Sequence, residues 1–194
     1  MPSRRSFIVG STAIATATAG CSDLVEEFDP DGSSSDDRGS DDGPMLDDQE
    51  TRRDLVETYN DAIGHTNVGL ETRDNGIAAQ NDEDFDRAGY EFETAAEAFG
   101  SAAEDFADAL ALSFQIEHEG AEEACKTGNE FARTMESAMS IIASSTEAAA
   151  MGEIEVANEI LEDGRELDQE ANDMDVRNTD EVAEMLGVEP EGGF

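Results

Sequence analysis

The chain has 194 residues, of which 49 are acidic and 11 are basic, so its formal net charge at pH 7 is −38. This surplus of negative charge argues against nucleic acid as a ligand, because no basic patch is available to neutralise phosphates. Beyond the N-terminal leader and linker described below, about 150 residues remain, which is enough for one domain with an apolar core.

The N-terminal residues have the features of an export signal. Ser3-Arg4-Arg5-Ser6-Phe7-Ile8 leads into an apolar run that ends at Ala19 and is too short to span a bilayer. The run closes with Thr18-Ala19-Gly20-Cys21. These residues resemble a twin-arginine signal, with Arg4 and Arg5 as its paired arginines, followed by a lipobox. The resemblance implies a signal peptide over 1–20, export of a folded protein, and lipid attachment at Cys21 on the extracytoplasmic face of the cell membrane.

The charge balance also carries a prediction about the environment. The residues before Cys21 include two arginines and no acid, so the remaining chain has 9 basic and 49 acidic residues and a net charge of −40. Repulsion on this scale strains a compact domain in dilute buffer, whereas at 1 M salt the Debye length is only ~3 Å. The acid surplus, with Lys126 as the only lysine, resembles the secreted lipoproteins of salt-loving archaea and implies adaptation to high salt.

Residues 21–45 are predicted to be the lipidated cysteine and a disordered acidic linker. They contain Ser33-Ser34-Ser35, Asp36-Asp37 and Asp41-Asp42. Low hydrophobicity and like charge oppose the formation of a packed core in such a segment. We expect a helical bundle over 46–176 and a short helix and tail over 177–194.

The folded part contains a regular row of phenylalanines, which we call the phenylalanine row. Its members recur every seven residues, and each is followed three residues later by an alanine: Phe85, Phe92, Phe99 and Phe106, with Ala88, Ala95, Ala102 and Ala109. This 3–4 spacing predicts an amphipathic helix from Phe85 to about Leu112, with its N-cap in Asn81–Asp84. Alanines beside bulky rings would let a partner helix approach closely.

Similar periods predict helices on both sides of this one. The preceding helix is expected from about Leu46 to Asn75-Gly76, read as a C-cap, with an apolar row of Val56, Ile63, Leu70 and Ile77 and with Tyr59 and Thr66 between them. The third is expected to end near Ala150 and to bury Ala121, Ala124, Gly128, Phe131, Met135, Ala138, Ile142 and Ser145. The fourth is expected to bury Ile154, Ala157, Leu161, Gly164, Leu167 and Ala171.

A short helix over about 180–186 should begin at Asn178 or Thr179 and end at Gly187. No segment has the pattern of a strand, and short connections favour antiparallel neighbours. The predicted fold class is therefore all-α, an antiparallel up-down four-helix bundle with a short C-terminal helix. The alternative is a set of helical hairpins like those of tetratricopeptide repeats. Residues 85–95 and 152–164 resemble the second helix of that repeat, and they start about two repeat lengths of 34 residues apart.

The sequence contains no recognisable catalytic or metal-binding pattern. Di-iron bundles use Glu-x-x-His on two helices, but Ala62 stands three positions before His65 and Gln115 three before His118. Both histidines are expected to be solvated polar residues. If Cys21 carries lipid, Cys125 has no disulfide partner in the chain and is expected to act as a small apolar residue. We therefore predict no catalytic residue, no metal site, no cofactor and no enzymatic activity.

These features together predict a membrane-anchored, extracytoplasmic, non-enzymatic helical lipoprotein that binds or scaffolds other envelope components. Its expected partners are membrane lipid, through Cys21, and another envelope protein. The sequence leaves two alternatives open. One is a metal- or cofactor-binding four-helix bundle, and the other is a protein-interaction module like the tetratricopeptide repeat.

Overall fold

The computed structural model describes residues 45–189, which form five helices and contain no strand. The helices are α1 (Met45–Asn81), α2 (Phe85–Gln115), α3 (Glu119–Ala150), α4 (Ile154–Asn172) and α5 (Thr179–Leu186). The all-α prediction is confirmed for this part of the chain. The predicted signal peptide with Arg4 and Arg5, Cys21 and nearly all of the linker lie outside the described residues, as does the tail from residue 190.

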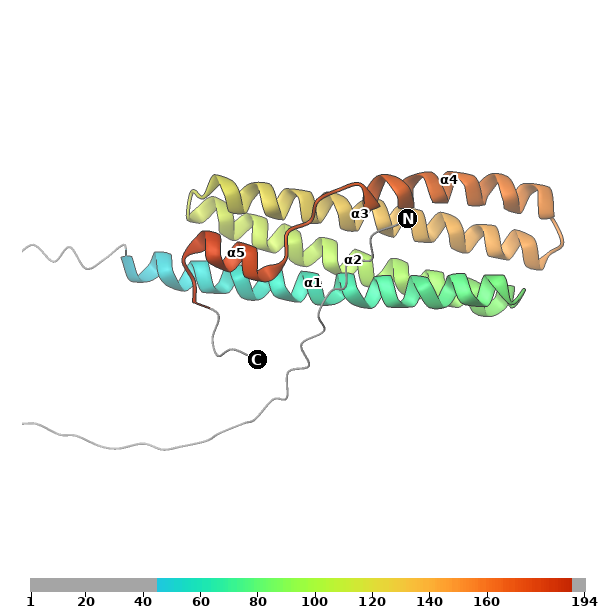
Figure 1. Cartoon of the computed structure of the whole chain (residues 1–194), viewed down its shortest axis with the longest axis horizontal. Helices are drawn as coiled ribbons and strands as arrows, with labels where there is room; N and C mark the ends of the chain where they lie inside the picture. Colours follow the sequence, from blue (N-terminus) through green and yellow to red (C-terminus); the bar gives the residue numbers. More distant parts are fainter. Residues whose placement is uncertain (1–44, 190–194) are drawn as a thin grey trace, which may run out of the picture. The chain divides into compact units, whose positions relative to one another are not determined.

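The helices pack in the order in which they follow one another along the chain (Figure 1). α2 lies against α1 and α3, and α4 lies against α3. Within residues 45–189, the backbone of α4 makes no close contact with α1 or α2. α5 returns to pack on α1 and α3. The two short helices, α4 and α5, therefore cover different parts of the long helices.

The phenylalanine row forms the centre of the core. Phe92, Phe99 and Phe106 are fully buried, together with all four alanines of the row, whereas Phe85 at the start of α2 is half-buried. Each of the three buried rings lies against a glycine of a neighbouring helix: Phe92 on Gly76, Phe99 on Gly69 and Phe106 on Gly128. A Cβ atom at these glycines would come within 2.5–2.8 Å of the ring. Glycine thus permits the close approach of the helices.

The first helix differs from its prediction at its end. It continues through Asn75–Gly76 to Asn81, so these two residues are no C-cap. Gly76 instead lies under the Phe92 ring, within the contact between α1 and α2. The predicted end was wrong because a single sequence does not distinguish a glycine that ends a helix from a glycine against which a side chain of another helix packs.

The buried face of the first helix also differs from its prediction. The buried residues are Leu55, Tyr59, Ala62 and Thr66, followed by Gly69, Gly76 and Ala79. The prediction was right for Tyr59 and Thr66. The row of Val56, Ile63 and Leu70 is only half-buried, however, and Ile77 is 42% exposed. Tyr59 packs on Phe106 of α2, with ring centroids 5.1 Å apart, and farther along α1 the small residues Gly69 and Gly76 lie against Phe99 and Phe92.

The other helices follow their predictions more closely. All eight positions predicted for the buried face of α3 are buried. In α4, Ala157, Gly164 and Ala171 are buried and the two leucines are half-buried, but Ile154 is 53% exposed and its prediction was wrong. α5 begins at a capping box made by Asn178 and Glu181. It ends at Gly187, whose φ of 66° is the left-handed conformation that glycine adopts at helix ends.

Candidate functional site

An open groove of about 710 Å³ runs between α2 and α3. Its α2 wall is formed by Asp86, Tyr90, Glu93 and Glu97, and its α3 wall by Glu136, Ser140, Ser144 and Glu147. Members of each wall are three or four residues apart, so they lie on one face of their helix. We call this the α2–α3 groove.

Small residues form the floor of the groove. Gly89, Ala96 and Ala143 lie between the two walls. A Cβ at Gly89 would stand 2.9 Å from the Thr146 Oγ1, so the two helices approach closely at this level. Thr146 is buried, and its hydroxyl donates a 2.7 Å hydrogen bond to the carbonyl oxygen of Ala143. The groove is open because these side chains are too short to fill the space between the walls.

The charge of the groove is entirely negative. Five carboxylates line it, and no basic side chain is among its lining residues: Asp86, Glu93, Glu97, Glu136 and Glu147. Beside them stands Tyr90, whose exposed fraction of 67% is the largest among the exposed large apolar residues of the described chain. An exposed aromatic residue next to a shallow, small-residue floor is typical of surfaces that bind other proteins.

Exposed apolar side chains gather at one end of the described helices. The groove is lined by Phe85 at the start of α2 and Ala150 at the end of α3, so these two helix ends lie close together. Tyr90 follows the first end closely, and Met151, Ile154 and Val156 follow the second, all exposed. An apolar surface that remains exposed in a chain this acidic marks a place where another molecule can bind.

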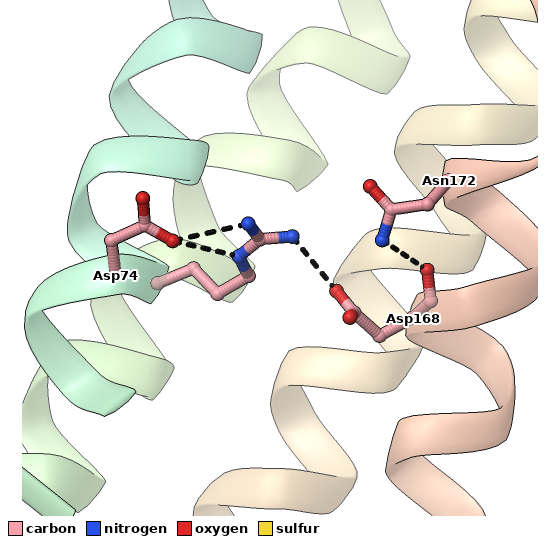
Figure 2. Close-up of polar contacts among 4 residues, drawn as sticks. Asp74, Asp168 and Asn172 are labelled. Atoms are coloured by element: carbon pink, nitrogen blue, oxygen red, sulfur yellow. Dashed lines mark hydrogen bonds and ion pairs between the residues drawn. The ribbon is translucent and has the colours of Figure 1, made fainter. Parts of the chain in front are cut away.

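An arginine of α1, Arg73, is linked to α4 (Figure 2). The Arg73 guanidinium donates to Asp168 at 3.0 Å, and to Asp74 of its own helix at 3.0 and 3.3 Å. The Arg73 side chain is 18% exposed. Asn172 donates through its side-chain amide to the carbonyl oxygen of Asp168, one turn earlier in α4 (Figure 2). Two carboxylates contact Arg73, and the one from Asp168 links α4 to α1.

The two histidines lie apart from each other and from the groove. His65 Nδ1 lies 2.7 Å from Asp105 Oδ2, and the His65 side chain is half-exposed as expected. His118 has a different role from the one predicted. It is the N-cap of α3, and its Nδ1 accepts a hydrogen bond of 3.2 Å from the backbone N–H of Ala121. Among residues 45–189, no cluster of three or more His, Cys, Asp or Glu is placed to hold a metal ion.

Cys125 is buried in α3 and forms no disulfide within residues 45–189. Burial raises the pKa of its thiol to about 12, because a thiolate would lose its hydration there. The thiol is therefore neutral at ordinary pH and is not a reactive nucleophile. This agrees with the expected role of Cys125 as a small apolar residue.

The chain matches no protein-family model, no curated protein and no solved structure. In the part that the structure describes, none of the helices has the length and apolarity needed to cross a membrane. The α2–α3 groove was not predicted from the sequence. The sequence offers one local signal for it, which is that three acidic residues and Tyr90 recur at helical spacing on an exposed face of α2. Such a pattern is also typical of an ordinary solvated helix face.

Proposed function

We propose that this protein is a non-enzymatic, lipid-anchored helical protein on the extracytoplasmic face of the cell membrane that binds or scaffolds another envelope protein. The α2–α3 groove, with its exposed Tyr90, is the observation that supports a binding role. The anchoring part of the proposal depends on the sequence features Arg4, Arg5 and Cys21. The high negative charge of the chain suits a protein that works in concentrated salt.

We further propose that the four longer helices run antiparallel, up and down, with α5 as the short C-terminal helix. Phe92 of α2 contacts Gly76 of α1, whereas Phe99, later in α2, contacts Gly69, which is earlier in α1. Residue numbers therefore rise along α2 where they decrease along α1. The same reversal holds against α3, where Gly89 faces Thr146 and Gly100 faces Glu136. The groove would then lie toward the end of the bundle that is farther from the start of α1.

The alternative with helical hairpins like those of tetratricopeptide repeats draws support from a different observation. α4 packs on its sequence neighbour α3, and within the described residues its backbone does not close a ring with α1. Repeat proteins of this kind also stack each unit on its neighbours along the chain. Both arrangements present surfaces between adjacent helices, so both agree with a binding role.

Lipid attachment is the first prediction from this proposal. Intact-mass analysis of protein extracted from membranes should show loss of residues 1–20 and an added lipid mass on Cys21. A Cys21→Ser variant should be released to the medium or remain unprocessed, since the attachment thiol is missing. The matched control is Cys125→Ser, which should keep the lipid. A native protein that begins at an unmodified Met1 would contradict the anchoring.

Binding to an envelope protein is the second prediction. Affinity capture of the anchored protein from native envelope, in high salt, should retain a specific protein partner that is absent from a capture with an unrelated acidic lipoprotein. High salt suppresses nonspecific electrostatic adsorption, because the Debye length falls to ~3 Å at 1 M. If repeated captures, with chemical crosslinking, retain nothing above the control, the binding role is wrong.

A further inference from the structure

We propose that the α2–α3 groove binds a basic amphipathic helix of a partner protein, with Tyr90 as its principal apolar contact. This inference rests on the proposed binding role and names the chemistry of the partner. Three properties of the groove point to it: the shape of the floor, the charge of the walls, and the exposure of one aromatic side chain.

The shape fits a helix. The α2 wall extends from Asp86 to Glu97, which corresponds to roughly 17 Å along the helix axis, or about three turns. The floor residues Gly89, Ala96 and Ala143 have at most one side-chain carbon each, so a third helix could approach closely. Amphipathic helices bind in hydrophobic grooves by placing apolar side chains there at helical spacing, and here the small residues of the floor would contact those side chains.

The charge selects a basic partner. Glu93 and Glu97 stand on one wall and Glu136 and Glu147 on the other, while no lining residue is basic. A helix with Lys or Arg along both of its edges would place cations beside each wall. An acidic segment or an anionic lipid surface would meet repulsion on both sides. The groove therefore favours a cationic helix over these other surfaces.

Tyr90 supplies the apolar contact. The chain buries Phe92, Phe99 and Phe106, yet it leaves Tyr90 67% exposed at the edge of the groove. Tyrosine is enriched among the residues that contribute most to binding, because it adds a large rigid surface with few rotatable bonds. In concentrated salt, long-range attraction between charges is screened, so affinity would depend strongly on this contact.

Two matched variants test the apolar contact. The probe is a synthetic 14-residue peptide with leucines on one helical face and lysines and arginines on the other. The control peptide has the same composition in scrambled order. We expect the full chain, in 1 M salt, to bind the amphipathic peptide at least tenfold more tightly than the scrambled one. Tyr90→Ala should weaken binding by about tenfold or more, as replacement of a central interface tyrosine does.

The matched control for Tyr90 is Phe114, which is also an exposed aromatic residue of α2 but is not among the residues lining the groove. Phe114→Ala should change peptide affinity less than twofold. Circular dichroism of both variants establishes that they fold like the wild type. Equal affinity of wild type and Tyr90→Ala, or equal losses in both variants, would overturn the inference.

A second pair of variants tests the charge. The double variant Glu93→Gln/Glu97→Gln should weaken peptide binding severalfold at 0.1 M salt. Glu104→Gln/Glu130→Gln removes the same net charge from exposed positions outside the groove and should have less than half of that effect. Equal effects would mean that the peptide responds to net charge alone, and the groove would not be its site.

The failure of this inference can be told apart from failure of the proposed function. Suppose that wild type and Tyr90→Ala capture the same envelope protein equally well. The binding role would then stand, and the groove would be excluded as the place where it occurs.

Discussion

Phe99→Ala is expected to lower the free energy of unfolding by about 3–5 kcal/mol, the usual range for removal of a buried phenylalanine ring. Phe99 is fully buried in the middle of α2. Its ring lies against Gly69 of α1 and makes an edge-to-face contact with Phe131 of α3, with centroids 6.2 Å apart. It therefore joins three helices. Because a domain is stable by only ~5–15 kcal/mol, this loss is a large part of the total.

The neighbouring residue provides the control for Phe99. Ala98 is half-buried, rotated by about 100° around the helix axis, and Ala98→Ser should cost less than ~1 kcal/mol. Both variants can be measured by denaturant unfolding followed by circular dichroism in high salt. If Phe99→Ala were nearly neutral while the helices persisted, the phenylalanine row would be a docking surface for a partner helix and not the core.

Gly69 tests the same contact from the other side. In the wild type, Gly69→Ala would place a Cβ 2.8 Å from the Phe99 ring, so the ring or the helix must shift, at a cost of roughly 1–3 kcal/mol. In the Phe99→Ala background the ring is gone. The same change should then stabilise the helix by up to ~1 kcal/mol, because alanine is the better helix former. A double-mutant cycle that showed no reversal of sign would contradict the direct contact.

The stability of the domain is expected to depend strongly on salt. The chain from Cys21 on carries −40, and dilution from 1 M to 0.1 M salt lengthens the Debye length from ~3 to ~10 Å. Exposed carboxylates then repel one another over longer distances. We expect the thermal midpoint to fall by at least about 10 °C, which corresponds to roughly 3 kcal/mol for a domain of this size. Thermal scans by circular dichroism across this salt range measure the change.

A charge-reduced variant separates this repulsion from other effects of salt. Four exposed glutamates that lie outside the α2–α3 groove can be changed to glutamine: Glu57, Glu71, Glu104 and Glu130. The variant should unfold at a higher temperature than wild type in 0.1 M salt, and at nearly the same temperature in 1 M salt. A midpoint of the wild type that stays constant from 1 M to 0.1 M would remove the physical basis for adaptation to high salt.

Much of the helical pattern could be predicted from the sequence because the signals are local. The heptad spacing of the phenylalanine row predicted that Phe92, Phe99 and Phe106 are buried, and the period of α3 predicted all eight of its buried positions. Asn178 and Gly187 predicted the limits of α5, since a capping side chain and a left-handed glycine act within a single turn. Burial on one face and capping both follow from the order of neighbouring residues.

Other features depend on which helix lies opposite. Gly69 and Gly76 of α1 lie against the rings of Phe99 and Phe92, which belong to α2. The buried face of α1 and the residue at which it ends therefore could not be predicted from the residues of α1 alone. The attachment of α4 through Arg73 and Asp168 joins residues 95 positions apart. The α2–α3 groove arises only when Gly89 and Ala96 meet Ala143 across two packed helices. Local periodicity shows which residues share a helix face. Only tertiary packing decides against which small residues a side chain of a neighbouring helix packs, and which small residues line an open groove.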